Sequence, residues 1–129
     1  MSNGPFRVLF VDDDQLVLSA LQRTLRGEDY EVLTTNEPLH ALRLMDELQI
    51  DVIVSDQAMP EMSGVELLGV VEQKYAHTVR VILTGHGTHG ADATDIASVQ
   101  RQLEKPWQSE QLRHAIRELV EEARRRRGG

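Results

Sequence analysis

The sequence predicts an α/β domain in which a parallel sheet is flanked by helices. Short β-rich segments alternate strictly with amphipathic segments, the pattern typical of a parallel sheet with helical crossovers. With 129 residues, 40% of them hydrophobic, the chain can bury one core but has no room for a second catalytic domain. No internal repeat or low-complexity linker interrupts the pattern. We therefore expect one domain over residues 1–129, with a core of about 6–124 between short tails.

Five segments rich in apolar and β-branched residues are expected to form the strands. The fourth is almost entirely apolar, as expected for a strand covered on both faces. The fifth carries Gln100, Arg101 and Gln102, so it is suited only to an edge of the sheet. The five expected strands are Phe6–Val11, Tyr30–Thr35, Asp51–Asp56, Val79–Leu83 and Val99–Glu104.

The first two helices are expected between the first three strands. Apolar residues recur there at intervals of three and four, the spacing of a helix with one buried face. The first helix should run from about Asp14 to Arg26, with Gly27 at a left-handed end. Asn36 is expected to cap the second helix, and Pro38 is tolerated in its first turn.

The remaining helices follow less regular segments. A loop over residues 57–64, indicated by its proline and glycine content, leads into the third helix. A short and weak fourth helix is expected over Ala91–Ser98, after a glycine-rich stretch. Ser109 is expected to cap the last helix, whose apolar residues form one stripe.

Composition and charge exclude several classes of function. The net charge of −7 argues against a dedicated nucleic-acid-binding surface. The basic run Arg124–Arg127 is interpreted as a helix end paired with Glu121 and Glu122, with a partner-binding or nucleic-acid-binding tail as the alternative. Cysteine is absent, which excludes disulfides, thiolate metal sites and a cysteine nucleophile. Since no signal peptide or membrane span is recognisable, we expect a soluble, cytoplasmic protein.

Four of the expected strands end in residues that could handle a phosphoryl group. Carboxyl ends of parallel strands meet at one edge of the sheet, where open α/β sheets bind their ligands. Adjacent carboxylates supply the oxygen ligands that Mg²⁺ prefers, and without a metal they would raise one another's pKa. The residues are Asp12, Asp13 and Asp14 after the first strand, Asp56 at the third, Thr84 after the fourth and Lys105 after the fifth.

Each of these residues also has an ordinary structural explanation. Asp14 is expected to cap the first helix. Three adjacent acids exceed what a cap needs, so Asp12 and Asp13 are assigned to the metal. Alone, Asp56 would be interpreted as a turn residue and Lys105 as a solvated lysine. Their position at the same end of different strands favours a shared site instead.

In order and spacing, these motifs resemble the receiver domain of two-component response regulators over nearly the whole chain. The resemblance implies a doubly wound, flavodoxin-like sheet of strand order 2-1-3-4-5 with five flanking helices. The motifs are Val-Asp-Asp-Asp at 11–14, Ser-Asp-Gln-Ala-Met-Pro-Glu-Met-Ser-Gly-Val-Glu-Leu-Leu at 55–68, Leu-Thr-Gly at 83–85 and Lys-Pro-Trp at 105–107.

The resemblance implies that Asp56 accepts a phosphoryl group from a histidine kinase or a histidine phosphotransfer protein. Lys105 and the Thr84 hydroxyl would then contact the phosphoryl oxygens. Alignment and charge neutralisation are the main requirements of phosphoryl transfer, and a metal, an ammonium and a hydroxyl meet them. The implied Mg²⁺ ligands are Asp13, Asp56 and the backbone carbonyl of Ala58, with Asp12 acting mainly through bound water.

Two other functions stay open. Gln102 stands where the family usually carries Tyr or Phe, which keeps a non-phosphorylated interaction module as an alternative. Asp12-x-Asp14 formally matches the nucleophile motif of small aspartyl-phosphate phosphatases, but the chain has no room for their substrate-covering cap. We therefore expect a signalling domain, not an enzyme, that catalyses only its own phosphorylation and dephosphorylation. The resemblance implies a downstream protein partner, which the sequence does not identify, and it allows a homodimer on phosphorylation.

Overall fold

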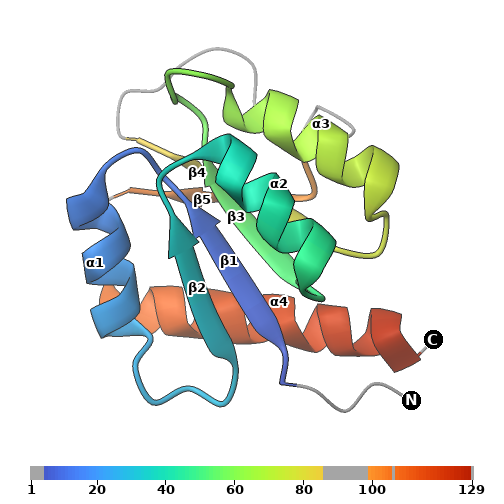
Figure 1. Cartoon of the computed structure of the whole chain (residues 1–129). Helices are drawn as coiled ribbons and strands as arrows, with labels where there is room; N and C mark the ends of the chain where they lie inside the picture. Colours follow the sequence, from blue (N-terminus) through green and yellow to red (C-terminus); the bar gives the residue numbers. More distant parts are fainter. Residues whose placement is uncertain (1–4, 86–98, 106, 129) are drawn as a thin grey trace.

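The described part of the chain forms a five-stranded parallel sheet with helices on both faces (Figure 1). The computed structural model describes residues 5–85, 99–105 and 107–128. The strand order is β2-β1-β3-β4-β5, which confirms the expected doubly wound topology. The helix expected over Ala91–Ser98 lies outside the described residues.

All strand pairs run parallel and in continuous register. The polar fifth strand pairs with β4 at one edge of the sheet, as its composition predicted. The strands are β1 Arg7–Val11, β2 Glu31–Thr35, β3 Val52–Asp56, β4 Val79–Thr84 and β5 Arg101–Glu104.

The helices divide the core into two layers. Side chains of a strand point alternately to the two faces, so Val8 and Phe10 pack in one layer, and Leu9 and Val11 in the other. The first layer is covered by α1 (Gln15–Thr24) and α4 (Ser109–Gly128), the second by α2 (Pro38–Glu47) and α3 (Gly64–Lys74) (Figure 1). None of the helices described is both long and apolar enough to cross a membrane.

α1 begins as expected but ends at Thr24, two residues before the expected Arg26. The Asp14 side chain accepts a hydrogen bond from the Leu16 N–H at 2.9 Å, which caps the helix. Gly27 follows the helix with a φ of 90°, a backbone conformation that favours glycine. The interpretation of Asp14 as a cap is therefore confirmed.

The starts of two other helices differ from expectation. Asn36 does not cap α2: the cap residue is Glu37, because Pro38 takes the first helical position, and the Glu37 side chain makes no capping bond. The Thr35 hydroxyl accepts the Glu37 N–H instead, at 3.2 Å. Ser109 is the first residue of α4 rather than the residue before it.

Two of the C-terminal arginines of α4, Arg124 and Arg126, lie against acids. Arg126 pairs with Glu122 at 3.2 Å, as the four-residue spacing predicted. Glu121 pairs with Arg124 at 3.2 Å, one position away from the expected Arg125. The interpretation of the run as an ion-paired helix end is thus confirmed for these arginines.

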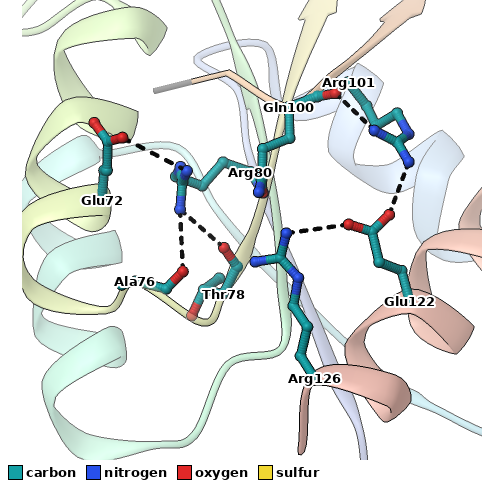
Figure 2. Close-up of polar contacts among 8 residues, drawn as sticks. All are labelled: Glu72, Ala76, Thr78, Arg80, Gln100, Arg101, Glu122 and Arg126. Atoms are coloured by element: carbon teal, nitrogen blue, oxygen red, sulfur yellow. Dashed lines mark hydrogen bonds and ion pairs between the residues drawn. The ribbon is translucent and has the colours of Figure 1, made fainter. Parts of the chain in front are cut away.

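Polar side chains attach the edge strand to its neighbours (Figure 2). Gln100, just before β5, donates its N–H to the Arg80 carbonyl, and its side-chain oxygen accepts the Arg80 N–H, both at 2.9 Å. Arg101 of β5 lies 2.9 Å from Glu122 of α4, which also holds Arg126. β5 is therefore joined both to β4 and to the last helix.

Arg80 is a buried cation within an apolar strand, 5% exposed. Its Nη1 donates to the carbonyls of Ala76 at 3.4 Å and Thr78 at 3.3 Å, and Nη2 lies 3.8 Å from Glu72 (Figure 2). Burial lowers the pKa of this guanidinium, and the charge of Glu72 opposes the shift. The Arg80 guanidinium is thus held by two carbonyl dipoles of the α3–β4 connection as well as by Glu72 of α3.

An ion pair holds α4 against the loop between α1 and β2. Arg117 donates two hydrogen bonds to the carboxylate of Glu28, each 2.8 Å long. These hydrogen bonds, together with the charge of Arg117, lower the pKa of Glu28 below its usual range. Such a carboxylate stabilises the fold above its ordinary pKa and loses that contribution as the pH falls through the lowered value.

We expect Glu28→Gln to lower the melting temperature slightly at neutral pH, because the amide cannot replace the charged pair. The difference from wild type should shrink as the pH falls through the lowered pKa of Glu28, where wild type loses the same charge. Thermal unfolding followed by circular dichroism across this range measures it. Glu47→Gln, at an exposed α2 glutamate, is the control. A difference that persists undiminished in acid would contradict the assignment.

Candidate functional site

Three carboxylates converge at the carboxyl edge of the sheet. Asp12 and Asp13 follow β1, and Asp56 is the last residue of β3. One oxygen of each side chain lies within 4.8 Å of the others, and Asp12 and Asp56 are buried while Asp13 is exposed. The structure thus brings together the three acids that the sequence pattern proposed, with one open to solvent.

Local hydrogen bonds hold Asp12 in place. Its N–H donates to the carbonyl of Thr35, at the end of the neighbouring β2, at 3.2 Å. Its Oδ1 accepts the N–H of Asp14 at 2.9 Å, a side-chain turn typical of aspartate. Asp14 in turn caps α1, so the acid triplet is divided between the helix start and the site.

Lys105 reaches the same edge from the end of β5. Its Nζ lies 2.8 Å from Asp12 Oδ2 and 3.4 Å from Asp56 Oδ1. Its backbone N–H donates to the carbonyl of Thr84 at 2.7 Å, which continues the pairing of β4 with β5. Burial would lower the pKa of Lys105, but close contact with Asp12 and Asp56 outweighs burial and raises it. The lysine is thus held as a cation.

The electrostatics of Asp56 are unfavourable for a bare carboxylate. Burial raises its pKa, the charges of Asp12 and Asp13 raise it further, and Lys105 offsets part of the rise. One ammonium therefore faces two buried carboxylates and an exposed one. Additional positive charge would relieve the remaining repulsion.

The donor set fits a hard divalent cation such as Mg²⁺. All the side-chain donors are carboxylate oxygens, which this ion prefers. The buried Asp12 Oδ2 lies 2.8 Å from the Lys105 ammonium, and its carboxylate keeps lone pairs that could face a metal or its bound water. Ala58, whose backbone carbonyl the resemblance implies as a further Mg²⁺ ligand, is exposed in the loop two residues after Asp56.

Thr84 lies at the same edge but is directed elsewhere. It is the buried last residue of β4, and its hydroxyl donates to the Leu103 carbonyl of β5 at 3.3 Å. Within the described part of the chain, no contact joins this hydroxyl to the three acids. The structure therefore brings Asp12, Asp13, Asp56 and Lys105 together, with Thr84 beside them.

Sequence reasoning missed the residues that fix the start of α3. Ser63 accepts the Glu66 N–H at 3.1 Å, and Glu66 accepts the Ser63 N–H at 2.9 Å, a reciprocal capping box. The Ser-x-x-Glu spacing was a usable signal. Gly64 approaches the Asp56 backbone so closely that a Cβ there would lie 2.4 Å from the Asp56 carbonyl oxygen. No local pattern reveals that contact.

Comparison with known proteins points to one family. The family model described as "Response regulator receiver domain" matches residues 8–117. The hydrogenase transcriptional regulatory protein HoxA of Cupriavidus necator is 34% identical over 127 residues, which cover 94% of this chain and 25% of HoxA. The chain thus spans about a quarter of the length of this curated relative.

Solved structures agree in fold. The signal receiver domain of an HD domain-containing protein from Pseudomonas fluorescens Pf-5 superposes with a TM-score of 0.84 at 27% identity, covering 94% of this chain and 98% of that one. The solution structure of a beryllofluoride-activated NtrC4 receiver domain dimer gives a TM-score of 0.80 at 32% identity, with 91% and 98% covered.

Proposed function

The chain belongs to the response regulator receiver domain family, and we propose that Asp56 is its phosphoacceptor, supplied by a histidine kinase or a histidine phosphotransfer protein. The observation that carries the proposal is the convergence of Asp12, Asp13, Asp56 and the Lys105 ammonium at one edge of the sheet. A buried carboxylate beside one fixed cation and a set of metal-binding oxygens suits phosphoryl transfer, which depends on alignment and charge neutralisation.

In the proposed reaction a carboxylate oxygen of Asp56 forms a bond to phosphorus. The bond between phosphorus and the imidazole nitrogen of the donor breaks, and its electron pair stays on that nitrogen. Bound Mg²⁺ would neutralise charge on the phosphoryl oxygens. The residues proposed to hold the ion are Asp13, Asp56 and the backbone carbonyl of Ala58, with Asp12 through bound water.

Lys105 and Thr84 would then change partners. Lys105, which contacts both buried carboxylates, would pair with the phosphoryl oxygens. The Thr84 hydroxyl would exchange the Leu103 carbonyl for a phosphoryl oxygen. Because Leu103 belongs to β5, this exchange would transmit the charge change to the edge strand.

The proposed unit is one signalling domain over residues 1–129, with a core of about 6–124. It would act on a downstream partner and catalyse no reaction beyond its own phosphorylation and dephosphorylation. The proposal includes pairing of two copies of the chain on phosphorylation. The beryllofluoride-activated NtrC4 receiver domain, which is a dimer, supports it. Gln102 stands where the family usually carries an aromatic residue. We therefore expect this chain to differ from its relatives mainly in how phosphorylation is passed on to the partner.

We expect the wild-type chain to gain a single phosphoryl group when it is incubated with Mg²⁺ and acetyl phosphate or phosphoramidate. Removal of divalent metal with EDTA should abolish the gain, because the crowded carboxylates would then repel the donor. Intact-mass spectrometry measures both. Absence of labelling in the presence of Mg²⁺ would contradict the proposal, and sustained turnover of a phosphate ester would indicate a phosphatase instead.

A further inference from the structure

Gln57, directly after the proposed phosphoacceptor, closes the following loop onto the first turn of α3. Its backbone carbonyl accepts the N–H of Gly64 at 3.0 Å, and its side-chain Oε1 accepts the N–H of Val65 at 2.9 Å. Both donors belong to the first turn of a helix, where N–H groups have no partner within the helix. One half-buried residue therefore supplies two acceptors to the start of α3.

The other contacts at this helix start do not involve Gln57. The capping box of Ser63 and Glu66 satisfies the next N–H group along the turn. Gly64 lies against the Asp56 carbonyl because it has no Cβ. The helix start is thus attached to the loop from both ends: by Ser63 on the helix side, and by Gln57 next to Asp56.

Gln57 also lies between two residues proposed to hold Mg²⁺. Asp56 precedes it and Ala58 follows it, so rotation of the backbone at Gln57 changes the direction of the Ala58 carbonyl relative to the Asp56 carboxylate. The side-chain bond to Val65 opposes that rotation, because it ties the residue to a helix rather than to the exposed loop. Ligands held in place before binding bind an ion more tightly than ligands that must first be ordered.

We propose that Gln57 is a positioning residue for metal binding, whose side-chain hydrogen bond to the Val65 N–H fixes the chain between Asp56 and Ala58. The inference rests on the proposed function, because the Mg²⁺ ligands are assigned there. Ser63 separates this role from ordinary helix stabilisation: it caps the same helix but lies outside the Asp56–Ala58 segment.

The test compares Mg²⁺ affinity, stability and amide exchange in four proteins. Gln57→Met keeps the length of the side chain but removes the acceptor, Gln57→Glu keeps an acceptor, and Ser63→Ala breaks only the capping box. Isothermal titration with MgCl₂ gives the dissociation constant, thermal unfolding gives the stability, and hydrogen exchange by NMR reports the Val65 amide with Leu9 of β1 as reference.

We expect Gln57→Met to speed exchange at Val65 without affecting Leu9, and to weaken Mg²⁺ binding up to about tenfold, the lower range for residues that orient metal ligands. Gln57→Glu should bind Mg²⁺ at least as tightly as wild type. Ser63→Ala should lower the melting temperature, as loss of a cap does, while its Mg²⁺ affinity stays within about twofold of wild type.

Unchanged Mg²⁺ affinity in Gln57→Met would overturn the positioning role. Equal weakening in Gln57→Met and Ser63→Ala would also overturn it, since the effect would then follow helix stability alone. Weakening in Gln57→Glu equal to that in Gln57→Met would show that the acceptor is irrelevant. If wild type itself bound no Mg²⁺, the proposed function would fail, and this inference with it.

Discussion

Asp56→Asn is expected to abolish covalent phosphorylation of the chain by acetyl phosphate. The amide cannot form the acyl phosphate that the carboxylate would form, and it removes one of the three charges that would hold Mg²⁺. Intact-mass spectrometry after incubation with Mg²⁺ measures the loss. We expect no phosphoryl adduct under conditions that label wild type.

The same substitution should leave the fold intact or stabilise it. Burial and the neighbouring acids raise the pKa of Asp56, so the native structure disfavours its charge, and a neutral side chain relieves that repulsion. A melting temperature at or above that of wild type would show that lost labelling reflects chemistry rather than unfolding.

Asp14→Asn is the matched control, because it removes a neighbouring acid from the same edge. Asn caps a helix about as well as Asp, so the bond to the Leu16 N–H can be kept. Phosphorylation should proceed at close to the wild-type rate. If the Asp56→Asn variant were instead labelled as fully as wild type, the phosphoacceptor would be another residue, with Asp12 and Asp13 the nearest candidates.

Gly64→Ala is expected to destabilise the chain and displace the proposed phosphoacceptor together. The added Cβ would lie 2.4 Å from the Asp56 carbonyl oxygen and 2.9 Å from the Ile82 side chain. The first neighbour is backbone at the end of β3, so either α3 or that strand end must move. Overpacking of this kind costs about 1–3 kcal/mol, and more where the neighbour cannot yield. Urea unfolding measures the loss.

Gly69→Ala provides the comparison within the same helix. Nothing lies within 4 Å of a Cβ at this position. Alanine is favoured over glycine inside a helix by about 0.5–1 kcal/mol, so this variant should be more stable than wild type. Phosphorylation should slow in Gly64→Ala and not in Gly69→Ala. Equal stability of the two variants would contradict the close approach of α3 to Asp56.

The parallel sheet and the meeting of the site residues could be predicted from the order of the segments, whereas the strand order 2-1-3-4-5 was implied by the resemblance to receiver domains. Alternation of segment types determines a parallel sheet, and a parallel sheet brings the ends of its strands to one edge. Asp12, Asp56 and Lys105 therefore met as expected, without any knowledge of their separate side-chain conformations. The edge position of β5 was likewise evident from its polar residues.

The errors and omissions concern contacts between elements. Asn36 matched the cap pattern, but Pro38 moved the helix start by one residue. The direction of the Thr84 hydroxyl depends on a carbonyl of β5, and the need for glycine at residue 64 depends on a carbonyl of β3. Arg80 is a charged residue in an otherwise apolar strand, and the carbonyls of Ala76 and Thr78 that accept its hydrogen bonds are evident only in the structure. Periodicity carries no information about such tertiary neighbours.

The attachment of β5 also makes completion of the site depend on docking of the edge strand. Lys105 and Asp56 are separated by 49 residues in sequence, and they meet only once the edge strand has docked through Gln100 and Arg101. A chain in which β5 had not docked would hold the three acids without the Lys105 ammonium, and we expect a phosphodonor to label it more slowly. The rate of labelling would thus report the fraction of molecules in which the edge strand is in place.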